Sequence, residues 1–178
     1  MRNISYTSFR RTALWLLLAV FVTTVVVAAF VLLLGMKPEL LDDERQTGIP
    51  SAIPEENGYT SYSAEGICEV VLCGNPEVHG KEVQLWLTNP ETNSVWLRAE
   101  LWSVAFTYDT AGKITAASPD KMLGKTGFIR PGEYVETVML SRELQEERTY
   151  VMIKISTYVE STRTSEGFFY INTSLFRQ

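Results

Sequence analysis

Histidine and cysteine are scarce in this chain, and their scarcity excludes several kinds of active site. One histidine, His79, and two cysteines, Cys68 and Cys73, occur among 178 residues. Structural zinc needs sets of cysteine and histidine ligands, and Ser-His-Asp or Cys-His hydrolases need a histidine held against the nucleophile. His79 falls in Asn-Pro-Glu-Val-His-Gly, which is typical of an exposed turn. The sequence predicts no catalytic residue, no metal ligand and no cofactor, so we expect a protein that is not an enzyme.

Charge is missing from one long stretch, residues 13–36, which are mostly leucine, valine, alanine and phenylalanine. As a helix with about 1.5 Å of rise per residue this stretch would be about 36 Å long, enough to cross a hydrocarbon core of about 30 Å. Three arginines and no acidic residue precede it. Because positive charge stays inside, we expect a cytoplasmic basic tail at 1–12, a transmembrane signal anchor at 13–36 and the remainder outside. A cleaved signal peptide is the alternative, but its apolar core is usually about 7–15 residues.

Basic residues are in the minority after Met36, where 13 of them face 21 acidic residues. An acidic exterior argues against nucleic acid as a partner, because phosphate contacts need lysine and arginine. Residues 37–63 contain Pro38, Pro50 and Pro54 among acidic and small polar residues. This composition predicts a flexible acidic linker between the lipid bilayer and a domain at residues 64–178.

A long helical period is also absent after Met36, and two-residue alternation takes its place. Val83, Leu85 and Leu87, for example, share one face of a predicted strand. Apolar character changes face near Ser103, which predicts a bulge or a strand that switches sheets. Strands are expected at residues 67–72, 82–88, 95–108, 114–117, 134–140, 150–159 and 168–176. About seven strands in a segment of this size predict an all-β, immunoglobulin-like antiparallel sandwich.

Two short motifs carry a resemblance to a known group of modules. They are Leu-x-Leu-Thr-Asn-Pro at residues 85–90 and Ile-Arg-Pro-Gly at residues 129–132, followed by Val135, Val138, Leu140, Leu144 and Tyr150. This order resembles the immunoglobulin or fibronectin-like sandwich modules common on Gram-positive bacterial surface proteins. The resemblance covers residues 66–178 and implies the sandwich fold and a Gram-positive bacterial surface. Together with the predicted anchor, it leads us to expect a single-pass protein of a bacterial, Gram-positive cytoplasmic membrane, with its C-terminal domain outside.

The two cysteines, Cys68 and Cys73, lie outside the predicted membrane span, where a disulfide can persist. In a straight strand they would be about 16 Å apart on opposite faces, whereas a disulfide needs Cα atoms about 4.4–6.8 Å apart. A bridge therefore requires a bend in the chain between them. Two free thiols and one disulfide both remain possible interpretations of the sequence.

The tryptophans are the best candidates for a functional surface. By alternation Trp86, Trp96 and Trp102 fall opposite the leucine and valine face of their strands, and Tyr158 joins them if the last strands are adjacent. Exposed together they would form an aromatic patch for a protein partner or a sugar, while buried they would only serve as cover or core. We expect a non-catalytic, membrane-anchored accessory or scaffold protein that contacts other envelope proteins. A glycan- or cell-wall-binding module that uses the tryptophans is the alternative.

Overall fold

The structure is a computed structural model that describes residues 15, 20–25, 44–50, 58–64 and 68–178. Residues 20–25 are helical, and their side chains and that of Trp15 are exposed. Among the described residues no helix is both long and apolar enough to cross a membrane. The basic tail at 1–12 and most of the anchor at 13–36 lie outside the described residues, so both stay predictions.

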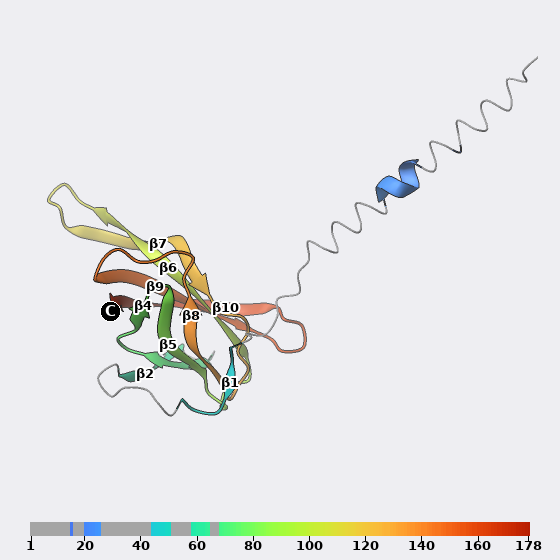
Figure 1. Ribbon diagram of the computed structural model, residues 1–178, viewed down its shortest axis with the longest axis horizontal. Helices are drawn as coiled ribbons and strands as arrows, with labels where there is room; N and C mark the ends of the chain where they lie inside the picture. Colours follow the sequence, from blue (N-terminus) through green and yellow to red (C-terminus); the bar gives the residue numbers. More distant parts are fainter. Residues whose placement is uncertain (1–14, 16–19, 26–43, 51–57, 65–67) are drawn as a thin grey trace, which may run out of the picture. The chain divides into compact units, whose positions relative to one another are not determined.

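Ten strands form one mixed sheet in the C-terminal part of the chain (Figure 1). In chain order they are β1 (Gln46–Thr47), β2 (Tyr59–Ala64), β3 (Cys68–Cys73), β4 (Glu77–His79), β5 (Glu82–Asn89), β6 (Trp96–Tyr108), β7 (Ile114–Lys125), β8 (Glu133–Met139), β9 (Arg148–Tyr158) and β10 (Ser165–Arg177). Their order in the sheet is β1-β8-β5-β4-β10-β9-β6-β7, with the β2–β3 hairpin attached to β5. The β4–β10 pair is parallel and the others are antiparallel. The prediction of a mostly β domain is confirmed.

All seven predicted strands are present, as β3 and β5 to β10. The sequence did not indicate β1, β2 or β4, and the first two lie largely within residues 37–63, the expected linker. Partners distant in the chain hold β1 in the sheet, because Arg45 lies 3.3 Å from Glu133 and the Tyr134 hydroxyl donates to Gln46 at 2.8 Å. Part of the expected linker is therefore paired within the sheet, where tertiary contacts override weak local preference.

The core lies between the β3–β5–β8 and β6–β9–β10 parts of the sheet. Its fully buried members include Val70, Leu72, Leu85, Leu87, Leu97, Leu101, Ile153, Ile155 and Leu175. Val83, Leu85 and Leu87, which were predicted to share one strand face, are each 0% exposed and belong to this core. Burying one such leucine or valine contributes about 1.5–3 kcal/mol. Single bridges from Leu97 to Ile129 and from Gly124 to Leu140 add contacts beyond the main strand order.

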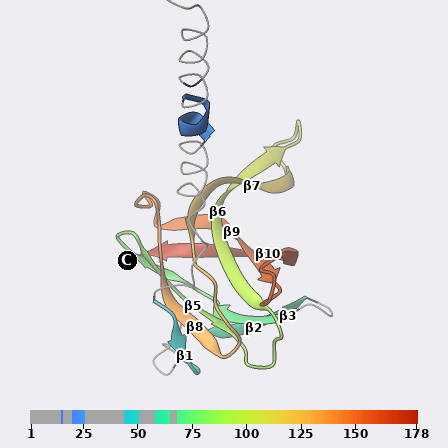
Figure 2. The same ribbon diagram turned by 90° about the vertical axis from the view of Figure 1, so that its right-hand side faces the viewer.

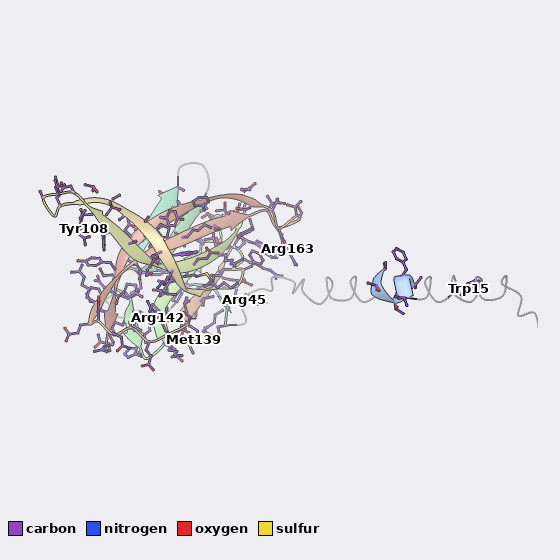
Figure 3. The ribbon with its side chains drawn as sticks, turned by 90° about the horizontal axis from the view of Figure 1, so that it is seen from above. Trp15, Arg45, Tyr108, Met139, Arg142 and Arg163 are labelled. Carbon is purple, nitrogen blue, oxygen red and sulfur yellow. The ribbon has the colours of Figure 1, made fainter. Side chains whose placement is uncertain are left out.

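The β6–β7 hairpin extends beyond the rest of the domain (Figures 1 and 2). β6 pairs with β9 only from Trp96 to Ser103, and the β6–β7 register shifts between Trp102 and Val104. An irregularity in the strand pairing therefore lies near Ser103, where the change of face predicted one. Figure 3 places Tyr108, at the end of β6, and Arg163 at opposite ends of the domain.

Candidate functional site

One side of β6, β9 and β10 faces the core, and the other side carries a group of aromatic side chains. Successive strand residues point to opposite faces, so the even-numbered residues of these strands lie opposite core residues such as Leu101, Ile153 and Ile171. We define the aromatic face as Trp102 and Phe106 of β6, Tyr150 of β9, and Phe168, Tyr170 and Phe176 of β10.

Three of these rings are open to solvent. Phe168 is 56% exposed, Tyr150 51% and Tyr170 41%, while the other three members are half-buried. Phe168 and Tyr170 meet edge to face with 5.7 Å between ring centroids, as do Phe106 and Tyr150 at 5.9 Å. Grouped exposed apolar side chains on a soluble domain mark interaction sites more often than single ones do.

A row of charges crosses the aromatic face, in which one carboxylate, that of Glu100, contacts two cations. Glu100 lies 3.7 Å from Arg98 and 3.6 Å from Lys154, and it accepts a 3.3 Å hydrogen bond from the Trp102 indole. The Lys154 ammonium also lies 4.9 Å from the centroid of the Phe168 ring. These contacts fix the orientation of the rings around Glu100.

At one end of the aromatic face lies a hollow of about 360 Å³, which we call the Arg148 hollow. Its lining residues are Asn75, Arg148, Tyr150, Asn172, Thr173, Ser174 and Phe176. The Arg148 guanidinium lies 4.9 Å from the Tyr150 ring and 5.6 Å from the Phe176 ring, and its Nε donates to the Ser174 hydroxyl at 3.0 Å. Arg148 is the single charged residue among those that line it.

Trp96 and Tyr158 are brought together at the opposite end of β6 and β9, where they are direct partners in the sheet. Phe128 packs between them, 5.8 Å from Trp96 and 4.9 Å from Tyr158. The guanidinium groups of Arg130 and Arg163 lie 5.3 and 5.8 Å from the Trp96 ring. With 5% of its surface exposed, Trp96 here serves as a covered anchor for these loops.

Trp86 stands apart from the other predicted tryptophans. It lies in β5 at an irregularity in the pairing with β8, with φ of 51° and 8% of its surface exposed. A bulky residue with positive φ is a backbone outlier, and a bulge is where one is tolerated. Its indole nitrogen has no hydrogen-bond partner among the described residues. Of the four residues predicted as a common surface, Trp102 alone belongs to the aromatic face.

Cys68 and Cys73 are buried thiols at the two ends of β3, and the alternative of a disulfide is not formed. Each of the six residues of β3 pairs with β2, so the strand makes no bend that would bring the sulfurs together. Burial raises the pKa of both thiols, and for Cys73 the backbone amide of Asn75 partly opposes this rise. A raised pKa keeps the reactive thiolate scarce near neutral pH.

A second, larger hollow of about 530 Å³ lies beside the turn between β5 and β6. Asn89, which lines it, is fully buried and donates 2.9 Å hydrogen bonds to the carbonyls of Val95 and Ile129. The Asn93 amide donates to Asn89 at 2.6 Å and to the Glu69 carbonyl at 2.5 Å, and Asn93 accepts from the Glu69 amide at 2.9 Å. The two motifs at residues 85–90 and 129–132 therefore meet at Asn89.

Among the described residues, the histidine and the acidic side chains do not form a catalytic or metal site. The His79 imidazole lies 3.6 Å from Glu77 on the surface. Within the described ranges no three histidine, cysteine or acidic residues are placed to hold a metal ion. The chain matches no protein-family model, no curated protein and no solved structure.

Proposed function

We propose that this chain is a non-catalytic accessory protein of a bacterial envelope that binds another protein through the aromatic face. Residues 13–36 would anchor it in the cytoplasmic membrane, with the β domain outside. The two groups of strands around one core are compatible with an immunoglobulin-like sandwich, to which β4 adds a parallel link. That fold assignment is part of the proposal.

The observation that carries the proposal is the exposure of Phe168, Tyr150 and Tyr170 on one sheet face. Aromatic side chains bury a large area at low conformational cost and are enriched in the centres of protein interfaces. Beside them, the Glu100 carboxylate already contacts Arg98 and Lys154, so a partner that covers it does not leave that carboxylate buried without a counter-charge.

A cell-wall glycan is less well supported than a protein partner. Stacking on a sugar needs an accessible ring face, and Trp86 and Trp96, two of the tryptophans considered for that role, are 8% and 5% exposed. Two of the open rings already meet edge to face. We therefore keep a glycan as an outcome of the experiment.

The experiment uses the full chain with a benzophenone amino acid in place of Phe168, irradiated in living bacteria. We expect one discrete protein adduct, and protease added to protoplasts should remove it because the domain is outside. The matched control places the same amino acid at Met139, which is 58% exposed and lies well away from Tyr108 and Arg163 (Figure 3). The same adduct at both positions, or an adduct that muramidase digests, would contradict the proposal.

A further inference from the structure

The Arg148 hollow contains polar groups that the described part of the protein does not use. Arginine has five N–H donors, and Arg148 uses one of them, its Nε–H, in a hydrogen bond to the Ser174 hydroxyl. The Arg148 side chain makes no ion pair and no other hydrogen bond with a described residue. The side-chain amides of Asn75 and Asn172, which line the same hollow, likewise make no hydrogen bond within the described ranges.

The guanidinium is also held in place before any ligand arrives. It stacks near two rings, Tyr150 at 4.9 Å and Phe176 at 5.6 Å, while Ser174 accepts from its Nε at 3.0 Å. A planar guanidinium fixed in this way loses less freedom on binding than a free arginine does. Its Nη groups then form a fork that matches the two oxygens of a carboxylate.

We propose that the Arg148 hollow binds a side-chain carboxylate of the protein partner, so that the aromatic face recognises an acidic residue flanked by apolar ones. This inference rests on the proposed function. The carboxylate would accept hydrogen bonds from the Arg148 Nη groups and from the amides of Asn75 and Asn172.

The surroundings favour a carboxylate over a phosphate or a neutral sugar. Phosphate recognition usually uses a cluster of arginines, and here one arginine lines the hollow. A sugar would need the ring faces, but the guanidinium lies against both Tyr150 and Phe176. Because the chain beyond Met36 has 21 acidic and 13 basic residues, a dense polyanion would be repelled. One carboxylate among apolar side chains fits both the single arginine and the neighbouring rings.

The test measures the yield of the Phe168 photo-crosslink in cells for variants of the full chain. Arg148→Gln removes the charge, and Asn172→Asp adds an opposing charge without touching the stacked rings. Both should lower the yield about ten- to hundredfold, as expected for the loss of hydrogen bonds to a charged group. Asn172→Ala should lower the yield about threefold or less. The yield of Arg148→Lys should lie between those of Asn172→Ala and Arg148→Gln, since lysine keeps the charge but loses the fork.

Arg142→Gln is the matched control, because it removes the same charge from an exposed arginine outside the hollow (Figure 3). It should leave the yield unchanged, and thermal unfolding should show that every variant folds. An unchanged yield in Arg148→Gln, or equal losses in Asn172→Asp and Asn172→Ala, would overturn the carboxylate site while the proposed function stands. If the parent chain gives no protein adduct at all, the proposed function itself fails and this inference with it.

Discussion

The larger hollow and the Arg148 hollow differ in what their side-chain amides bind. In the larger one the buried amide of Asn89 donates to two backbone carbonyls and accepts from Asn93, and the Tyr59 hydroxyl bonds to that of Thr88. In the smaller one the amides of Asn75 and Asn172 and most of the Arg148 donors have no bond to a described residue. Size alone therefore does not show which of the two hollows could bind a partner.

The difference follows from burial. Asn89 is 0% exposed, so any donor or acceptor it left unpaired would cost about 1–3 kcal/mol, whereas Asn172 is exposed and water can satisfy it in the free protein. The Asn89 amide thereby joins the ends of β5 and β6 to the segment at Ile129. The buried, hydrogen-bonded amide of Asn89 stabilises the fold, whereas the exposed amide of Asn172 is available to a partner.

On this comparison, the largest loss of stability is expected for the variant Asn89→Ala. The variant removes two donated hydrogen bonds and leaves the buried carbonyls of Val95 and Ile129 with fewer donors. We expect the free energy of unfolding to fall by about 2–4 kcal/mol. Urea unfolding of the full chain in detergent, followed by tryptophan fluorescence, measures the change. A loss below about 0.5 kcal/mol would show that Asn89 is not the structural centre of this hollow.

A smaller effect on the free energy of unfolding is expected at alkaline pH, from groups in β2 and β3. Burial raises the pKa of Cys68 and Cys73 above the ordinary 9.0 and that of Tyr59 above 10.0, although the hydrogen bond to Thr88 opposes the rise for Tyr59. Above these ordinary values the unfolded chain releases protons that the folded chain retains. The free energy of unfolding should therefore be independent of these groups below about pH 9 and should fall as pH rises beyond it.

Urea unfolding between pH 7 and 11 checks this dependence. A Cys68→Ala, Cys73→Ala double variant should lose the part of the decline that begins near the ordinary thiol pKa of 9.0 and keep the later part from Tyr59. An unchanged profile in the double variant would mean that the thiols titrate alike in both states. Asn172→Ala, in the other hollow, should show the profile of the parent chain.

Local pattern was sufficient for the strands that pack against the core. The strands β5, β9 and β10 were all predicted, and their residues Leu85, Ile153 and Ile171 are buried in the core. β1 and β4 are two and three residues long, too short for any period to be visible. They exist because β8, β5 and β10 supply their partners, and no local signal carries that information.

The candidate site was only partly predictable, because the predicted surface consisted of three tryptophans and Tyr158 and did not include the phenylalanines and other tyrosines of these strands. Trp102 lies on the aromatic face, but Trp96 is covered by Phe128 and two arginines from distant loops. Alternation in the predicted strand at residues 168–176 puts Phe168 and Tyr170 on one face and Phe169 and Ile171 on the other, so a signal for the aromatic face was present in the sequence. The position of Arg148 between two rings depends on the β9–β10 register, which the sequence does not reveal.

The smallest effect is expected for Asn172→Ala, and it completes the contrast with Asn89→Ala. Asn172 is exposed and its amide has no hydrogen bond to a described residue, so truncation removes little that stabilises the fold. We expect a change in the free energy of unfolding within about 0.5 kcal/mol, measured in the same urea experiment. A loss comparable to that of Asn89→Ala would mean that Asn172 is structural. The smaller hollow would then resemble the larger one, and the physical distinction between them would disappear.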